Sequence, residues 1–211
     1  MPLKLNGTNS VAAPAYAGDD ADTGLQCGTN ELNLVTGGTA RVKIASDGAV
    51  QLLSSTGIDF SGIQTNASGM TSEILDSYEE GTWTPVYEGS TTAGTYTYGS
   101  RFANYTKIGN TVHLQCSINN ITTTSAGTGS ARITGLPFTA KGNTGTYQGP
   151  MRLSRFNVAD DAVTIQVSLN GNSSTATLTE TRDGQSAASV AVTDRMDNNS
   201  DVYFNITYFV A

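Results

Sequence analysis

The chain is poor in the residues on which most enzymes and nucleic-acid-binding proteins depend. Its 211 residues include one histidine, two cysteines and one tryptophan, and 14% of them are charged. The Lys and Arg residues number 11 against 18 Asp and Glu, which gives a formal net charge of −7, and they are scattered singly. Because phosphate binding requires clustered basic side chains, this balance argues against a nucleic-acid partner.

Long apolar segments are also missing from the sequence. No run approaches the roughly 18 residues that a helix needs to cross a bilayer, so no membrane insertion is expected. Residues 1–7 contain no apolar stretch of the kind found in a secretory signal, so we expect the chain to fold in a cytoplasm. This expectation weighs against a secreted bacterial lectin, one alternative for a polar chain of this kind.

The few chemically reactive residues do not form a recognised catalytic or zinc site. His113 is predicted on the polar face of a strand, and no Gly-x-Ser-x-Gly nucleophile elbow accompanies it. One histidine with the distant Cys27 and Cys116 is too few for zinc, and Cys116 is expected to be buried and unpaired. The neighbouring Glu79 and Glu80 would diverge, whereas glycoside hydrolysis needs two carboxylates facing one bond. The sequence therefore predicts no enzyme and no cofactor.

Two oxygen-rich segments are candidates for calcium binding. Asp20, Asp22 and Glu31 have the spacing of positions one, three and twelve of an EF-hand loop. However, Leu25 stands where that loop requires glycine, so a solvated acidic turn is the preferred interpretation. Residues 194–201 are richer in Asp and Asn. An ordinary loop is preferred there too, and metal binding at this segment stays open.

Turn residues and β-branched residues dominate what is present. Glycine alone occurs 23 times, and Ser, Thr and Asn are frequent, whereas strong helix formers are few. The dipeptides Asp47-Gly48, Gly109-Asn110 and Asn170-Gly171 predict hairpin turns between short alternating segments. About ten strands are expected after residue 81, which suits a jelly-roll-like β-sandwich. The predicted fold class is therefore all-β.

The chain is expected to have four parts. A short helix is predicted around residues 71–78, with Thr71 or Ser72 as its cap and Gly81 as its stop, and it would form a helical collar before the larger domain. The predicted parts are an extended anchoring arm (1–24), a small N-terminal β-hairpin module for oligomerisation (25–55), a linker with the short helix (56–80) and a β-sandwich head domain (81–211).

The small β module has too few large apolar residues for a core of its own. Sharing its apolar face with other copies would complete that core, so the sequence predicts an oligomer. The residues expected at the oligomer contact come from the module, the short helix and the segment after it: Leu32, Leu34, Val42, Ile44, Ile74, Leu75, Tyr78 and Trp83.

Tyrosines are the candidate binding residues. A tyrosine offers apolar area and a hydroxyl at low entropic cost, which suits the recognition of sugars or proteins. Ordinary sheet packing or contact between copies is the alternative role for the same side chains. The candidates are Tyr87, Tyr96, Tyr98 and Tyr147.

Several motifs resemble those of tailed-bacteriophage virion proteins. Tyr-Glu-Glu-Gly-Thr-Trp-Thr-Pro at residues 78–85 precedes Tyr-Thr-Lys-Ile-Gly at 105–109 and Gly-Leu-Pro-Phe at 135–138. This succession resembles the C-terminal module of tail-fibre and related virion proteins. Asp-Thr-Gly at 22–24, with Thr-Gly-Gly-x-x-Arg-Val and Asp-Gly-x-Val after it, resembles a module found near the start of such fibres.

The resemblance implies a structural protein of the virion that is assembled in the host cytoplasm. It implies a homotrimeric short tail fibre that attaches to other virion proteins through residues 1–55. The C-terminal β domain would then bind a host-surface receptor, either a glycan or a protein. The alternative is a head fibre or a capsid or tail decoration with a mechanical role, because the chain is short for a fibre and shows no long heptad shaft.

Overall fold

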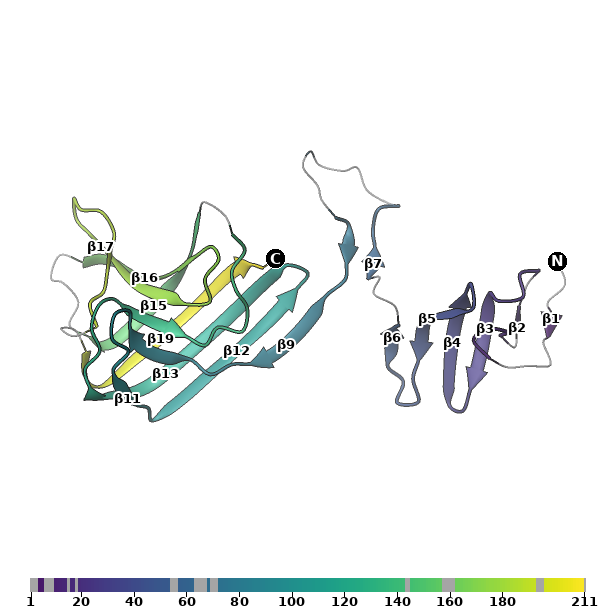
Figure 1. The fold of residues 1–211 in the computed structure, drawn as a ribbon, viewed down its shortest axis with the longest axis horizontal. Coiled ribbons are helices and arrows are strands. Elements are labelled where there is room, and N and C mark those ends of the chain that lie inside the picture. The colour runs from purple at the N-terminus through teal and green to yellow at the C-terminus, as the bar shows by residue number, and fades with distance from the viewer. Residues whose placement is uncertain are drawn as a thin grey trace. The chain divides into compact units, whose positions relative to one another are not determined.

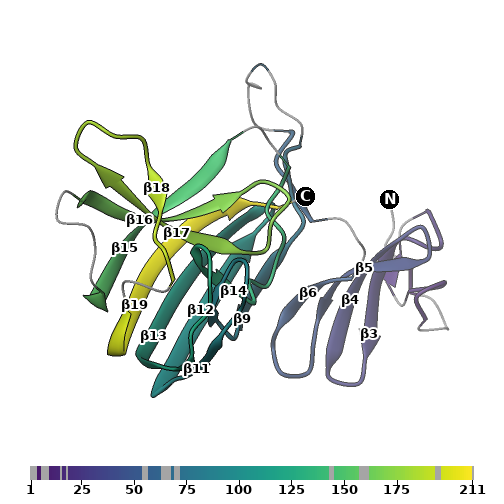
Figure 2. The same cartoon turned by 60° about the vertical axis from the view of Figure 1, so that its left-hand side comes forward.

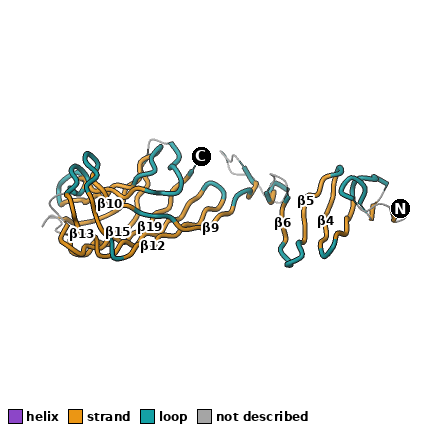
Figure 3. Tube along the Cα trace, turned by 60° about the horizontal axis from the view of Figure 1, so that its bottom comes forward, coloured by secondary structure: helices purple, strands orange, loops and turns teal. Residues whose placement is uncertain are grey.

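The structure is a computed structural model of the chain. It describes residues 4–5, 10–14, 16–17, 19–53, 57–62, 68, 72–142, 145–156, 162–192 and 196–210. Within these ranges the chain forms strands and turns without any helix, so the predicted all-β class is confirmed (Figure 3). No described segment is therefore a helix capable of spanning a membrane. The chain divides into two compact units, Met1–Asp76 and Ser77–Ala211.

The first unit contains a six-stranded sheet in which each strand is antiparallel to the next one in sequence (Figure 1). Two tight turns explain this meander. Gly37 and Gly38 both have positive φ, as a two-residue hairpin turn requires, and Gly48 has a φ of 87° in the next turn. The strands are β1 (Lys4–Leu5), β2 (Tyr16–Ala17), β3 (Gly24–Gly28), β4 (Glu31–Thr36), β5 (Thr39–Ile44) and β6 (Val50–Leu52).

The helix predicted around residues 71–78 is wrong wherever the chain is described. Strand β8 (Ile74–Leu75) pairs with β7 (Ile58–Asp59) in a small separate sheet, and β9 begins at Tyr78. The Ser72 hydroxyl accepts a hydrogen bond from the Ile74 amide at 3.1 Å, which closes one turn and does not start a helix. A helix of one or two turns forms too few hydrogen bonds to offset its nucleation cost, whereas strand pairing satisfies the same backbone groups. The described residues thus contain no helical collar.

The second unit is built on one continuous antiparallel sheet. Its strand order is β10-β14-β17-β16-β15-β19-β13-β12-β9, with β11 paired to β13 and β18 paired to β17. The strands are β9 (Tyr78–Thr82), β10 (Val86–Gly89), β11 (Thr95–Thr97), β12 (Ser100–Ile108), β13 (Thr111–Ser125), β14 (Ala131–Thr134), β15 (Thr146–Phe156), β16 (Ala162–Asn170), β17 (Ala176–Arg182), β18 (Ala188–Ser189) and β19 (Met196–Phe209).

Strand β15 is the corner at which this sheet folds over. Residues 146–150 pair with β16, whereas residues 151–156 pair with β19. The change of partner falls at Pro150, which has no amide hydrogen to donate to a sheet ladder. Gly149, just before it, lies so close to β19 that a Cβ there would be 2.1 Å from the Asn205 carbonyl oxygen. Figure 2 shows the resulting curl, with β16 and β17 lying across the strands of the other half.

The hydrophobic core lies inside the curl. Alternate residues of β13 and β19 face inward and are buried, and the same holds for β14, β16 and β17 in the other half. Cys116 is one of them, so its predicted burial and unpaired state are confirmed. The predicted jelly-roll sandwich needs correction in one respect: the two layers that enclose the core are halves of a single hydrogen-bonded sheet rather than separate sheets.

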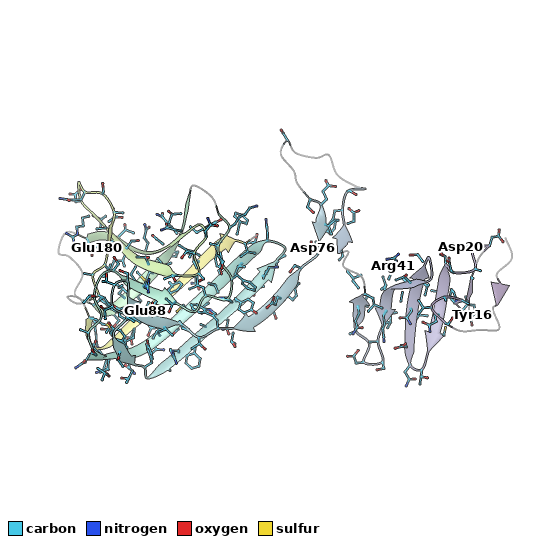
Figure 4. The ribbon with its side chains drawn as sticks, viewed as in Figure 1. Tyr16, Asp20, Arg41, Asp76, Glu88 and Glu180 are labelled. Atoms are coloured by element: carbon cyan, nitrogen blue, oxygen red, sulfur yellow. The ribbon has the colours of Figure 1, made fainter. Side chains whose placement is uncertain are left out.

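A buried charge lies on β17. Glu180 is 1% exposed, and its carboxylate accepts hydrogen bonds from the Arg182 side chain, with an Nη2–Oε1 distance of 2.5 Å. A second pair joins Glu88 on β10 to Arg132 on β14 at 2.6 Å, where both side chains are more exposed. Figure 4 labels Glu180 and Glu88. The two pairs differ in burial, so breaking them should have different costs.

Candidate functional site

The four candidate tyrosines take part in sheet packing. Tyr87 is 1% exposed, and its ring meets that of Tyr96 edge-to-face at 5.1 Å. The Tyr98 hydroxyl accepts a hydrogen bond from the Tyr87 amide at 3.1 Å and lies 3.3 Å from the Tyr87 carbonyl oxygen. Tyr147 packs elsewhere, against the buried ring of Tyr208. The structure thus gathers Tyr87, Tyr96 and Tyr98 into one cluster, which lines the core instead of forming an exposed platform.

The first unit has an exposed apolar face on its six-stranded sheet. Strand register aligns Tyr16, Leu25, Leu34, Val42 and Leu52 in one row across five strands. A parallel row on the same face contains Cys27, Leu32, Ile44 and Val50. We call these two rows the apolar face; Figure 4 labels Tyr16, at one end of the first row. Most of its large side chains are exposed, Leu34 at 45% and Val50 at 69%.

The opposite face of the same sheet carries hydrogen-bonded polar side chains next to the buried Val35. The Asn33 side-chain amide donates to Gln26 at 2.6 Å, and Lys43 forms an ion pair with Glu31. That pairing lowers the pKa of Glu31 because the ammonium favours its charged form. The sheet therefore exposes its more apolar side to solvent, and an exposed apolar patch of this size is typical of an interaction surface.

Most of the predicted oligomer-contact residues are accessible. Leu32, Leu34, Val42 and Ile44 all belong to the apolar face, and Ile74, Leu75 and Tyr78 are exposed on β8 and β9. Trp83 differs, because it is 9% exposed and packs in the core of the second unit. Its burial within its own chain leaves little of its surface for a contact between copies.

A polar face covers the outer side of the second unit on β12, β13, β19 and β15. Register places Phe102, Ser117, Tyr203 and Arg152 in one row across these strands. The next row contains Asn104, Gln115 and Asn205. Residues more than 80 positions apart in sequence are thereby brought side by side.

A pocket of about 430 Å³ opens on this polar face, and we call it the Arg152 pocket. Three neighbouring strands line it at the point where β15 changes partner. The lining consists of residues 115–117 on β13, 150–152 on β15 and 203–205 on β19.

Two side chains in the Arg152 pocket hold each other in place. The Arg152 guanidinium carbon lies 5.4 Å from the centre of the Tyr203 ring, within the range of a cation–π interaction. The Tyr203 hydroxyl donates to Asn119 Oδ1 at 2.5 Å. Asn119 in turn donates to Ser117 at 3.2 Å and to Ser100 at 3.0 Å. This network holds the Tyr203 ring, against whose face the arginine lies.

The chemistry of the lining suits binding. Gln115 and Asn205 offer both donors and acceptors, and Arg152 offers a planar fork of N–H donors. None of the nine lining residues, all of which the structure describes, carries a carboxylate or an imidazole. General acid–base catalysis uses such groups within hydrogen-bond reach of the substrate. The amide and guanidinium groups of the lining can hydrogen-bond to hydroxyl groups of a ligand.

The sequence-based reasoning missed Gln115, Arg152, Tyr203 and Asn205. Alternation within each strand could have shown that each side chain points outward. It could not show that they share one site, because the register between β13, β19 and β15 is a tertiary property.

The other candidate residues have structural roles. His113 Nδ1 lies 3.0 Å from the Thr207 hydroxyl on the outer face. Glu79 and Glu80 accept hydrogen bonds from different tyrosines, Tyr105 and Tyr78, as expected for diverging neighbours on a strand.

The described residues contain no cluster of three or more His, Cys, Asp or Glu side chains placed to hold a metal. Asp20 accepts from the Thr23 hydroxyl at 2.8 Å in an exposed turn, which lowers the pKa of Asp20. The loop expected at residues 194–201 is wrong for residues 196–201, which belong to strand β19. Asp194 lies outside the described residues.

Comparisons with known proteins concern the fold alone. No protein-family model and no curated protein sequence matches the chain. The crystal structure of the Dettilon tailspike protein is similar to this structure, with a TM-score of 0.52 and 18% sequence identity. The match covers 63% of this chain and 24% of the tailspike chain. Over that part of its length, this protein shares a fold with a segment of a tailspike.

Proposed function

We propose that this protein is a structural component of a bacteriophage virion, a homotrimeric short tail fibre. Residues 1–55 attach it to other virion proteins, and the second unit binds a receptor on the host surface. The observation that carries the proposal is the contrast between the two units: one exposes an apolar face, and the other has an open pocket whose lining includes Gln115, Arg152 and Asn205. The tail-fibre-like motifs and the tailspike-like fold support a role in the virion.

Self-association follows from the apolar face of the first unit. Burying apolar surface contributes about 25 cal/mol per Å², so a sheet that leaves two rows of large side chains in water gains by covering them. A second and third copy would bring the same rows, as a symmetric oligomer requires. Ile74 and Leu75 of the first unit and Tyr78 of the second are exposed as well, and we propose that each contacts other copies.

Receptor binding is assigned to the Arg152 pocket on the second unit. Its lining combines amides, hydroxyls and a guanidinium on rigid strands, which favours recognition of a polar surface such as a glycan. Since the lining carries no acid–base pair, we propose binding without cleavage. In the alternative role, as a head fibre or a capsid or tail decoration, the first unit would do the essential work and the pocket would have no receptor.

Binding of the full chain to host cells tests the proposal. The labelled protein would be titrated onto cells of the bacterium in which the phage propagates, with and without their surface polysaccharide. We expect saturable binding that is lost after the polysaccharide is stripped. A protein that is oligomeric by light scattering and folded by circular dichroism, yet does not bind, would overturn the receptor role and support decoration.

A further inference from the structure

Arg152 differs from the other arginines of the described chain. Each of the others donates at least one hydrogen bond from its side chain within the protein: Arg41 to Thr36, Arg101 to Pro85, Arg132 to Glu88, Arg155 to Asn199 and Arg182 to Glu180.

The Arg152 guanidinium lies over the face of the Tyr203 ring. Among the described residues, no carboxylate lies within ion-pair distance of it. Arg41, Arg101 and Arg155 also lack a carboxylate partner, but each donates a hydrogen bond to a hydroxyl or carbonyl oxygen of the protein. No such bond is made by the Arg152 side chain to any described residue. Its N–H donors stay available at the mouth of the pocket.

The surroundings favour a carboxylate as the group that uses these donors. A guanidinium binds a carboxylate through two parallel N–H···O bonds, which are stronger and more directional than neutral hydrogen bonds. No lining residue carries a negative charge that would repel such a ligand. Tyr203, held by Asn119 at 2.5 Å, positions the guanidinium before any ligand arrives, which reduces the entropic cost of binding.

The rest of the lining favours a sugar as the carrier of that carboxylate. Gln115 lies directly opposite Asn205 in the register of β13 and β19, and Ser117 lies in the adjacent row. Side-chain amides and hydroxyls can each donate to and accept from sugar hydroxyls. The volume of about 430 Å³ falls in the range of small-molecule pockets and suits one or two sugar rings.

We propose that the Arg152 pocket binds a saccharide that carries a carboxylate, such as a uronic acid. Arg152 binds the carboxylate, and Gln115 and Asn205 bind the hydroxyls beside it. The inference rests on the proposed receptor-binding function and specifies its ligand. The inference predicts that the receptor is an acidic surface polysaccharide and not a neutral one.

The test compares two probes that differ in charge and share their hydroxyl pattern. Trigalacturonic acid and its methyl ester would be titrated against the full chain by calorimetry or by NMR chemical-shift changes. We expect the acid to bind at least tenfold more tightly than the ester. We expect its affinity to fall as salt is raised, because salt screens the ion pair. Equal affinity for the two probes, or no binding of the acid, would overturn the inference.

Two variants locate the binding site. Arg152→Gln removes the charge of an exposed side chain and should lower the affinity for the acid at least tenfold while leaving the weak binding of the ester unchanged. Arg155→Gln removes a charge from the same strand, outside the pocket lining, and should leave both affinities unchanged. Unchanged acid binding by Arg152→Gln, or an equal loss in both variants, would contradict the assignment. Thermal melting confirms that each variant is folded.

The two proposals can fail separately. If Arg152→Gln binds host cells as tightly as the unmodified chain, the receptor role stands and the acidic-sugar site is wrong. If the unmodified chain binds trigalacturonic acid but no host cell, the pocket assignment stands and the receptor role is wrong.

Discussion

Leu25 on β3 lies directly opposite Leu34 on β4, and both side chains are exposed, at 38% and 45%. Val42 and Leu52 continue the same row on β5 and β6. Cross-strand apolar pairs normally face a core, because burial is what makes them stabilising. Here the row is exposed on a sheet of one layer, and the proposed oligomer would cover it with the same row from other copies.

Leu34→Asp should break the oligomer. The substitution places a charge in the centre of the apolar face, where burial against other copies would remove its hydration. We expect multi-angle light scattering to show a mass shifted from the trimer toward the monomer of 22.0 kDa. Val163→Asp, which changes an exposed side chain on β16 of the second unit, is the control and should keep the trimer. A Leu34→Asp protein of trimer mass would show that this face is not the contact.

The two cysteines report on the same contact. Cys27 belongs to the apolar face and is exposed in the single chain, whereas Cys116 is buried and burial raises the pKa of its thiol. A maleimide should therefore react slowly with Cys27 in the trimer and faster in Leu34→Asp, while Cys116 stays unreactive in both. Equally fast labelling of Cys27 in the two proteins would mean that the apolar face is uncovered in the trimer.

Gly149→Ala should destabilise the second unit strongly. Its Cβ would meet the Asn205 carbonyl oxygen at 2.1 Å, and a backbone atom cannot move aside as a side-chain end can. We expect a loss of about 2–3 kcal/mol in unfolding free energy by urea denaturation, the upper range for overpacking. Gly109→Ala is the control: its φ is 57° and its Cβ meets nothing, so about 1 kcal/mol of backbone strain is expected. Similar losses at both sites would rule out a close approach of β15 to β19.

Arg182→Ala should cost more stability than Arg132→Ala. Removing Arg182 takes away a cation that pairs with Glu180, whose side chain is 1% exposed, and we expect a loss of about 3 kcal/mol. Glu88, the partner of Arg132, is 19% exposed, so water can replace part of its ion pair and about 1 kcal/mol is expected. Chemical denaturation of both variants measures the difference. If the order were reversed, burial of the carboxylate would not be what sets the cost.

The second unit should lose stability at high pH. Burial raises the pKa of Tyr208 from 10.0 to about 12, because it disfavours the charged phenolate. A group whose pKa is raised by folding makes its full contribution to folding stability below its unfolded pKa. That contribution is lost as the pH rises from the unfolded pKa toward the folded one. The urea midpoint should therefore fall between pH 10 and 12, and Tyr208→Phe should make that fall shallower. A midpoint that stays flat over this window would show that Tyr208 ionises freely in the native state.

Local patterns correctly predicted much of the strand content. The turn Gly109-Asn110 joins β12 and β13, and alternation in residues 111–119 correctly placed Cys116 inward and His113 outward. The same reasoning failed for residues 74–78, where helical spacing of Ile74, Leu75 and Tyr78 suggested a collar. A short segment has weak intrinsic preference, so the strand partners available in the fold decided its structure.

By itself, the sequence determined many of the strands, several of the turns between them and which side chains share a side of each strand, because these properties depend mainly on neighbours along the chain. The tertiary structure decided which strands pair and in what register. It turned Tyr87, Tyr96 and Tyr98 toward the core, aligned Leu25 with Leu34 on an exposed face, and placed Arg152 beside Tyr203. Register joins residues far apart in sequence, and a shift of one residue would move every side chain to the opposite face.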